Sequence, residues 1–161
     1  MLSSHVPKNV ESKCEDATCI IEDLEAKIKH YENNIMYLPV KNPIVTSGYG
    51  WRKHPIHKQT RFHEGVDLKS TTTDTVYAVN DGEIRSYTSK GLGKYVKLVC
   101  GSEEFTYGHL SKILVEGTVA KGQAIAIMGS TGSSTGKHLH FEHIKNDTLL
   151  NPSMNQYLNH E

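Results

Sequence analysis

From Val40 onward, short runs of β-branched and aromatic residues alternate with turns rich in glycine, asparagine and aspartate. Residues of the first kind favour strands, and those of the second kind favour the turns between strands. Many short strands at this spacing predict a mainly β fold built on a small antiparallel sheet. The expected strands cover residues 44–46, 75–79, 83–87, 95–99, 104–107, 124–128 and 138–144. Asn80-Asp81-Gly82, between two of them, predicts a tight hairpin turn.

The chain before Pro39 follows a different period. Between Cys14 and Leu38, apolar residues recur at alternating steps of three and four, and most charged residues lie outside this stripe. The pattern predicts one amphipathic helix over residues 11–37, which ends there because a residue that precedes proline avoids helical dihedral angles. Two interpretations stay open. The stripe packs against the chain's own β domain, or it self-associates or binds a partner helix through residues 14–38.

These two patterns divide the chain into two predicted parts. Residues 1–39 form an N-terminal helical segment with a linker, and residues 40–161 form a β domain long enough to bury a core. The 18 lysines and arginines balance the 18 aspartates and glutamates. This balance provides no basic excess for binding nucleic acid or an acidic membrane surface, so neither is an expected partner.

The cysteines and the apolar segments limit the setting in which the chain works. Three cysteines without a framework spacing argue against a disulfide scaffold, and we expect Cys100 to be a buried, small apolar side chain. Residues 1–13 lack the apolar stretch of a secretory signal, and no run is long enough to span a bilayer. We therefore expect a chain without a membrane span, made without an export signal or present in a trimmed form.

Histidine is unusually frequent, with 10 residues, and two of them, His138 and His140, are separated by a single residue. Side chains alternate between the two faces of a strand, so both histidines share one face with Glu142. Leu139 and Phe141 then point the other way, into a core. Two imidazoles on the polar face of a strand, beside a loop rich in glycine and serine, indicate a functional site.

A second segment supplies another imidazole and a carboxylate, His63 and Asp67. It differs from the helical zinc motif His-Glu-x-x-His because its last member is aspartate and because Gly65 weakens a helix. The alternation around Asp67 predicts a strand there, with His63 on a loop before it and Glu64 facing solvent. Together the two segments hold enough nitrogen and oxygen donors for a zinc ion with an open coordination position.

Two further segments carry weaker signals. Residues 129–137 are rich in glycine and serine but lack the spacing of a phosphate-binding loop. We interpret them as a flexible rim that gives an extended substrate access to the backbone. His109 ends a predicted strand in the segment 107–111, and taken alone it fits a structural role or a catalytic one.

Three of these segments together resemble the motifs of the lysostaphin/LytM-type zinc endopeptidases. They are His-Glu-Gly-Val-Asp at 63–67, Tyr-Gly-His-Leu-Ser at 107–111 and Ser-Thr-Gly-Lys-His-Leu-His-Phe-Glu at 134–142, in the family's order and after a similar lead-in at 47–52. The resemblance covers about residues 40–157 and excludes the predicted helix. It implies a small antiparallel β domain with a substrate groove across one sheet. It also implies that the substrates are peptide bonds of peptidoglycan stems or cross-bridges.

The resemblance implies a role for five side chains. His63, Asp67 and His140 would be the ligands of one zinc ion. His138 and His109 would be the catalytic pair beside the open coordination position. We favour His138 as the general base and His109 as the residue that positions water or stabilises the oxyanion, and the sequence alone allows the two roles to be exchanged.

Other positions are assigned around this site. Lys137 stands where the family often has proline and Ala126 where glycine is common, and neither position is a ligand. His54 and His57 are expected on a loop beside the groove, within reach of substrate. His143 falls on the strand face opposite to that of the ligand histidine, so we expect it to make no metal contact.

We therefore expect a zinc-dependent endopeptidase that hydrolyses peptidoglycan peptides at the cell wall, in the periplasm or outside the cell. The cross-link between D-alanine and diaminopimelate is favoured over a glycine bridge, because the chain shows no separate domain for binding glycine bridges. The alternative is a non-catalytic protein that regulates amidases, binds the wall or builds a virion. All five site positions are filled, which argues against a degenerate regulator, whereas the heptad stripe keeps the virion component open. A virion-associated, lysis-released or trimmed exported form would each reach the wall without a visible signal.

Overall fold

The computed structural model describes residues 17–53, 60–152 and 157–158 of the 161-residue chain. The chain divides into two compact units, Met1–Ile35 and Met36–Glu161. This boundary lies before the one predicted between the helical segment and the β domain.

The first unit contains the helix and the second contains the strands. Over the described residues the elements are α1 (Ala17–Asn34), β1 (Met36–Tyr37), β2 (Pro43–Ser47), β3 (Gly50–Lys53), β4 (Thr60–His63), β5 (Val66–Ser70), β6 (Thr75–Tyr77), β7 (Gly82–Ser89), β8 (Gly93–Cys100), β9 (Glu103–Ile113), β10 (Gly117–Val119), β11 (Ala124–Met128), β12 (Leu139–Lys145), β13 (Thr148–Leu150) and β14 (Tyr157–Leu158). The mainly β fold with an antiparallel sheet, predicted from the sequence, is confirmed.

Helix α1 is shorter at its C-terminal end than the sequence predicted. It ends at Asn34, and strand β1 follows, paired in parallel with β14. The Tyr37 amide donates to Val79 O at 2.7 Å, and Leu38 is buried in the β core with only 2% of its surface exposed. Burial of Leu38, together with the restriction from the proline after it, keeps this segment out of the helix. Residues 11–16 of the predicted helix lie outside the described residues, and no helix in the described part is long and apolar enough to span a membrane.

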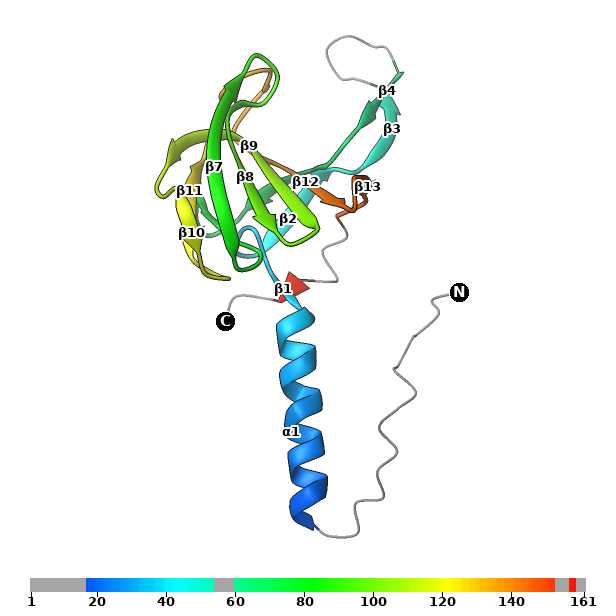
Figure 1. Cartoon of the computed structure of the whole chain (residues 1–161). Coiled ribbons are helices and arrows are strands. Elements are labelled where there is room, and N and C mark those ends of the chain that lie inside the picture. Colours follow the sequence, from blue (N-terminus) through cyan, green and yellow to red (C-terminus); the bar gives the residue numbers. More distant parts are fainter. Residues whose placement is uncertain (1–16, 54–59, 153–156, 159–161) are drawn as a thin grey trace. The chain divides into compact units, whose positions relative to one another are not determined.

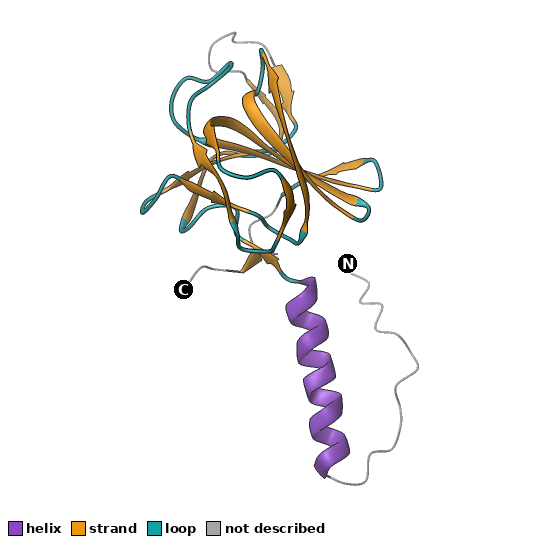
Figure 2. Cartoon of the chain, turned by 60° about the vertical axis from the view of Figure 1, so that its left-hand side comes forward, coloured by secondary structure: helices purple, strands orange, loops and turns teal. Residues whose placement is uncertain are grey.

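Most strands belong to one antiparallel sheet. Its main path runs β10-β7-β8-β9-β12-β5-β2, while β11 pairs with β9 and β6, and β13 pairs with β12. The strands are strongly twisted rather than flat (Figure 1 and Figure 2). Strand β12 lies between β9 and β5 on this path, so side chains of these three strands that share a face are brought together.

Alternate residues of the central strands form the core. Leu139 and Phe141 on β12 are fully buried, as the alternation in the sequence predicted. Phe141 packs against Tyr107 and Phe105, with ring centroids 5.2 and 6.0 Å apart. The Tyr107 hydroxyl accepts a hydrogen bond from the Val79 amide at 3.1 Å, so this polar group is satisfied inside the core. His140 and Glu142, which alternate with the core residues on β12, are turned to the opposite side of the sheet.

The Asn80-Asp81-Gly82 segment turns the chain but does not form the predicted hairpin. Strand β6 before it pairs with β11, and strand β7 after it pairs with β8 and β10. The tightest hairpin turns need positive φ at their central residues, and neither Asp81 nor Gly82 has it. A Cβ atom at Gly82 would lie 2.4 Å from Val99 O, so this glycine permits close packing of β7 on β8 instead. The prediction was wrong because a local turn signal does not choose the partners of the strands beside it.

Strands β3 and β4 form a separate two-stranded hairpin that ends at His63 (Figure 1). On one face of this hairpin, Phe62 packs edge-on against Trp51 and Tyr49, with ring centroids 5.5 and 5.1 Å apart. Alternation along the two strands puts Arg52 and His63 on the other face. The aromatic packing thereby fixes the orientation of Arg52 and His63, which both line the histidine-rich cleft.

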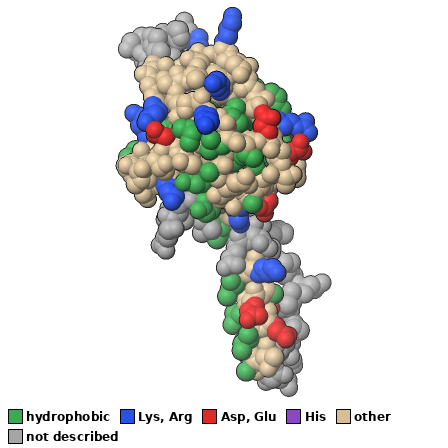
Figure 3. All heavy atoms as spheres, turned by 90° about the vertical axis from the view of Figure 1, so that its left-hand side faces the viewer, with side chains coloured by type: hydrophobic (Ala, Val, Ile, Leu, Met, Phe, Trp, Pro, Cys, Tyr) green, Lys and Arg blue, Asp and Glu red, His purple; other side chains and the backbone are tan. Residues whose placement is uncertain are grey.

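The surface carries charges of both signs. Figure 3 shows lysine and arginine side chains interspersed with aspartate and glutamate over one face of the molecule. This distribution agrees with the zero formal net charge of the chain. The face shown offers no large basic area of the kind that binds nucleic acid.

Candidate active site

Strand β12 brings the candidate site together. Its His140 is in register with Asp67 of β5 on one side and with Gly108 of β9 on the other. His109 follows Gly108 on β9, and His63 ends β4 just before β5 begins. Residues that are far apart in the sequence therefore meet around His140.

The structure corrects one local assignment and confirms two. His63 is the last residue of β4 and pairs with Gly50 of β3, whereas the sequence predicted a loop. The hairpin was missed because its charged and aromatic residues do not show the apolar alternation of a half-buried strand. Asp67 lies on β5 and Glu64 is exposed, as predicted.

The three predicted metal ligands point their donor atoms at one another. His140 Nδ1 lies 3.0 Å from Asp67 Oδ1 and 3.1 Å from His63 Nε2. His63 Nε2 lies 3.2 Å from Asp67 Oδ1. Two imidazole nitrogens and one carboxylate oxygen form the donor set of a zinc site that keeps a fourth position open. These residues therefore fit a zinc ion.

Each of the two predicted ligand histidines is oriented by a hydrogen bond from its other ring nitrogen. His63 Nδ1 donates to Gly48 O at 2.8 Å, and His140 Nε2 donates to Glu142 Oε1 at 3.0 Å. These acceptors select the tautomers that present the remaining nitrogens to the shared position. The sequence placed Glu142 on the same strand face as His140 but did not identify it as this acceptor.

Burial and charge pairing act in opposite directions on the pKa values of Asp67 and His140. Burial by itself would raise the pKa of Asp67, but hydrogen bonds and charge from His140 and His63 outweigh it and hold that pKa well below its usual range. Burial would lower the pKa of His140, but its bonds to Asp67 and Glu142 raise that pKa to about 9. A proton on His140 and a metal ion at the shared position are alternatives, because metal binding needs the neutral imidazole.

His109 lies inside β9, which runs on to Ile113, past the strand end that the sequence predicted. Its φ of 62° is uncommon for a residue other than glycine. The His109 amide donates to Leu92 O and its Nδ1 donates to Thr131 O, both at 2.8 Å, and these bonds hold the residue in that conformation. The bond from Nδ1 leaves Nε2 with the lone pair. Burial, the largest cause, lowers the pKa of His109 and so favours its neutral form.

His138 faces His109, with ring centroids 4.7 Å apart. Its Nδ1 donates to Gly136 O at 2.8 Å, and its Nε2 lies 3.6 Å from Asp67 Oδ1. Strand β12 begins at Leu139, one residue after the predicted start, so His138 stands at the end of the loop before the strand. The ring therefore presents its second nitrogen to the Asp67 carboxylate, which also faces His63 and His140.

All five predicted site residues line one cleft of roughly 210 Å³. Its lining consists of Arg52, His63, Asp67, Gly91, Leu92, His109, Ser133, Thr135, His138 and His140. The proximity of the five residues is observed, and their roles in metal binding and catalysis stay predictions. Sequence reasoning missed Arg52, although it stands in the lead-in segment that resembles the family. It also missed Gly91 and Leu92, which carry no motif or periodic signal.

The segment 129–137 contributes to the rim of this cleft and packs closely on neighbouring backbone. Thr131 Oγ1 accepts a hydrogen bond from the Lys94 amide at 3.0 Å. A Cβ atom at Gly132 would lie 2.3 Å from the Gly93 nitrogen, so only glycine fits at this approach. Backbone contacts of this segment, as well as its side chains, therefore shape the cleft.

The remaining predicted residues lie outside the cleft or outside the described part of the chain. His143 is on the opposite face of β12, as expected, and is buried against Phe105 with ring centroids 4.4 Å apart. His54 and His57 lie outside the described residues, so their contact with substrate stays a prediction. Cys100, predicted to be buried, is only partly buried because it ends β8, and burial raises the pKa of its thiol to about 12.

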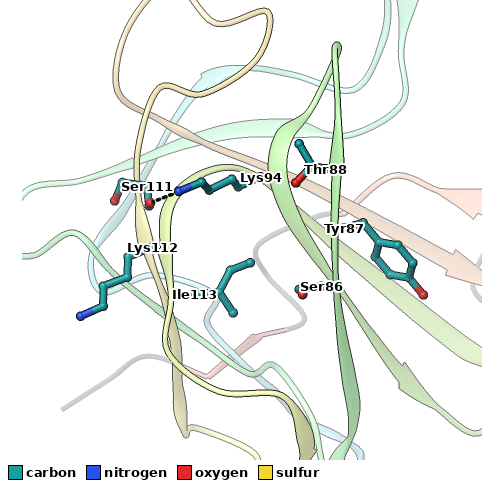
Figure 4. Close-up of a pocket in the computed structure, with 7 residues that line it drawn as sticks. All are labelled: Ser86, Tyr87, Thr88, Lys94, Ser111, Lys112 and Ile113. Carbon is teal, nitrogen blue, oxygen red and sulfur yellow. Dashed lines mark hydrogen bonds between the residues drawn. The ribbon is translucent and has the colours of Figure 1, made fainter.

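A second, wider hollow lies on the surface of the sheet (Figure 4). It has a volume of roughly 590 Å³ and is lined by Ser86, Tyr87, Thr88, Lys94, Ser111, Lys112 and Ile113. Lys94 Nζ donates to Ser111 O at 3.3 Å across it. None of the five site residues lines this hollow, so the histidine cleft is the candidate active site.

Comparison with known proteins places the chain among peptidases. The sequence profile of peptidase family M23 matches residues 61–152, more than half of the chain. An uncharacterized metalloprotease of Haemophilus influenzae is 44% identical over 63% of this chain and 22% of its own length. The peptidoglycan DD-endopeptidase ShyB of Vibrio cholerae serotype O1 is 39% identical over 61% of this chain and 24% of its own length. The glycyl-glycine endopeptidase ALE-1 of Staphylococcus capitis is 38% identical over 62% of this chain and 29% of its own length.

The chain spans less than a third of the length of these three relatives. Among solved structures, a zinc-containing peptidase from Vibrio cholerae matches with a TM-score of 0.64 at 35% identity, over 71% of this chain and 37% of that one. The catalytic domain of lysostaphin from Staphylococcus simulans matches with a TM-score of 0.56 at 33% identity, over 67% of this chain and 89% of that one. Because the family profile spans most of the β domain and all five site residues, this chain belongs to the metallopeptidase family M23.

Proposed function

We propose that this chain carries the catalytic domain of a zinc-dependent endopeptidase that hydrolyses peptide bonds in peptidoglycan. The observation that carries the proposal is the convergence of His63 Nε2, Asp67 Oδ1 and His140 Nδ1 at mutual distances of 3.0 to 3.2 Å. Two more imidazoles border the same position. Relatives named as peptidoglycan and glycyl-glycine endopeptidases support the substrate class. Such a substrate would place the activity at the cell wall, in the periplasm or outside the cell.

His63, Asp67 and His140 hold the zinc ion in this proposal. When bound, zinc supplies a Lewis acid that polarises the scissile carbonyl and activates water. The chain's own task is to keep the three donors in place. Gly48 O and Glu142 do this by fixing the orientation of the two imidazole rings.

His138 and His109 move and hold protons in this proposal. With Nδ1 bound to Gly136 O, His138 uses Nε2 to take a proton from the attacking water and pass it to the leaving amine. Asp67, 3.6 Å from that nitrogen, stabilises the imidazolium that forms. His109 has Nδ1 bound to Thr131 O, so its Nε2 accepts a hydrogen bond and positions the water.

A digest of purified sacculi tests the proposed activity. The zinc-loaded chain is incubated with sacculi of the diaminopimelate type and with sacculi that contain glycine bridges, and the products are identified by mass spectrometry. We expect new amino groups at one defined peptide bond, absent with His140→Ala and with a chelator. Intact sacculi of both types, despite one bound zinc ion per chain, would falsify the proposal.

We further propose that the cross-link between D-alanine and diaminopimelate is preferred over a glycine bridge. The relatives bear names of both kinds, so their similarity alone does not choose between them. The same digest separates the two substrates, because each type of sacculus yields products of a different mass. Cleavage restricted to glycine bridges would contradict this preference.

We also propose that α1 self-associates or binds a partner helix. Its apolar stripe includes Ile21, Leu24 and Ile28, each about half exposed, at the spacing of a coiled-coil seam. Leu24→Glu introduces a charge into this seam, so it should lower the molar mass measured by light scattering. If the unaltered chain is monomeric at every concentration tested, self-association is contradicted. Binding to a helix of a partner protein is then the interpretation that remains.

A further inference from the structure

Arg52 lines the histidine cleft from β3. Its Nη2 lies 3.6 Å from Asp67 Oδ2, the carboxylate oxygen other than the one that faces the histidines. Its Nε is buried and has no hydrogen-bond partner among the described residues. A guanidinium has five N–H donors. One long ion pair with Asp67 therefore leaves Arg52 with donors for a further acceptor.

A second arginine stands directly across the hairpin from the first. Arg52 and Arg61 are register partners on β3 and β4, so their side chains leave the same face, which His63 shares. Arg61 is exposed, and over residues 17–53 and 60–152 no ion pair involves it. Like charges directly opposite each other destabilise a strand pair. A hairpin that keeps this arrangement beside a cleft is suited to an anionic ligand.

With a divalent cation bound, the charge of the cleft would differ from that of the whole chain. Formal charges cancel over the full sequence. Among the described residues, the ionisable side chains other than histidine that line the cleft are Arg52 and Asp67, whose charges offset each other. A divalent cation held by the ligand residues then leaves a net positive charge in the cleft. Such a cleft favours an anionic substrate over a neutral one.

We propose that Arg52, assisted by Arg61, binds a free carboxylate of the substrate peptide near the scissile bond. The preferred substrate is then an acidic peptide and not a neutral glycine bridge. Arg52 contacts a proposed zinc ligand, and an extended residue spans about 3.3–3.6 Å, so the carboxylate belongs about one or two residues from the scissile carbonyl. A guanidinium fork binds a carboxylate through two parallel hydrogen bonds, which a lysine ammonium does not match. The inference rests on the proposed function, whose substrate class it narrows.

Two peptides that differ in one group test this inference. One carries a free carboxylate beside the scissile bond, and the other carries the corresponding amide. We expect the zinc-loaded chain to show a kcat/KM at least about tenfold higher for the free acid. Arg52→Gln should abolish that preference mainly through KM, Arg61→Gln should reduce it, and Arg52→Lys should restore part of it. Arg85→Gln is the matched control, because Arg85 is exposed on β7 and pairs with Glu83.

Equilibrium binding gives a readout that does not depend on turnover. Calorimetry with the same two peptides measures the affinity of the unaltered chain and of Arg52→Gln, and zinc content per chain reports on any loss of metal through Asp67. Equal losses of affinity for both peptides in Arg52→Gln overturn the inference and make Arg52 a positioning residue for Asp67. Equal affinities of the unaltered chain for both peptides overturn it as well.

The inference and the proposed function fail in different ways. If the unaltered chain cleaves neither peptide but binds the free acid more tightly, and Arg52→Gln removes that difference, carboxylate binding stands and the peptidase proposal fails. If both peptides are cleaved with the same kcat/KM, the peptidase proposal stands and carboxylate recognition by Arg52 fails.

Discussion

His140 Nδ1 lies 3.0 Å from Asp67 Oδ1, across a register pair that joins β12 to β5. The two residues are 73 positions apart in the sequence. The backbone ladder between the two strands therefore fixes the spacing of an imidazole nitrogen and a carboxylate oxygen. Donors held in this way by strands form a more exact metal site than donors on loops.

Glu142→Gln should weaken zinc binding about 10- to 100-fold. The Glu142 carboxylate accepts the hydrogen bond from His140 Nε2 and so orients the ring, and a glutamine lacks the negative charge that strengthens this bond. Burial would raise the pKa of Glu142, but the bond with His140 lowers it, so the carboxylate is ionised at neutral pH. Competition with a chromophoric chelator measures the affinity. Glu64→Gln, an exposed neighbour of His63, is the matched control, and equal affinities in all three forms would contradict the role of Glu142.

His138→Ala and His109→Ala should each lower kcat by a factor on the order of 10²–10⁴ while zinc stays bound. Neither residue belongs to the three converging donors, and each presents Nε2 beside them. The release of amino groups from sacculi gives the rate, and metal analysis gives the zinc content. His140→Ala should differ from both by losing zinc. A variant that keeps its full rate would remove that histidine from the proposed pair.

Gly132→Ala should destabilise the chain by about 1–3 kcal/mol. A Cβ atom there would lie 2.3 Å from the Gly93 nitrogen, and the φ of Gly132 is +72°, a left-handed conformation that residues with a side chain rarely adopt. The change should also reduce activity, because the adjacent Thr131 O accepts the bond from His109. Gly136→Ala is the matched control, since a Cβ atom there meets nothing within 4 Å. Denaturant midpoints that are equal in the two variants would show that the Gly132 contact relaxes without cost.

His143→Phe should remove a part of the decrease in the free energy of unfolding that occurs as the pH falls. Both ring nitrogens of His143 are buried without a hydrogen-bond partner in the described structure, and Glu103 Oε1 lies 3.8 Å from Nε2. Burial, the largest cause, lowers the pKa of His143, and Glu103 only partly opposes it. The unfolded chain then binds more protons than the folded one. This group's contribution to stability is therefore full above its unfolded pKa of about 6.5 and is lost as the pH falls through the folded value.

Urea unfolding at pH 7.5 and pH 5 measures this effect. The unaltered chain should lose more of its free energy of unfolding over that interval than His143→Phe does. The variant should also be more stable by about 1 kcal/mol or more at pH 7.5, because it buries no unpaired ring nitrogen. The same loss between the two pH values in both forms would assign the acid sensitivity to other groups.

The sequence by itself determined those features that depend on local alternation and residue type. His138, His140 and Glu142 alternate with Leu139 and Phe141, and period two is a property of any strand, so the polar and the buried face of β12 followed directly. The five site residues were identified from three short motifs and their resemblance to a family. The structure then brought all five to one cleft.

Only the tertiary structure decided the features that depend on partners distant in the chain. Residues 35–37 of the predicted helix are not helical, because the Tyr37 amide donates to Val79 O and Leu38 beside it is buried in the β core. Gly82 packs against Val99 O instead of closing a hairpin. Arg52 reaches the cleft because the hairpin β3–β4 turns its aromatic side chains to the opposite face. His109 adopts its uncommon φ because Leu92 O and Thr131 O accept its hydrogen bonds. Strand register and long-range hydrogen bonds set these positions, and neither follows from the residues next to them in the sequence.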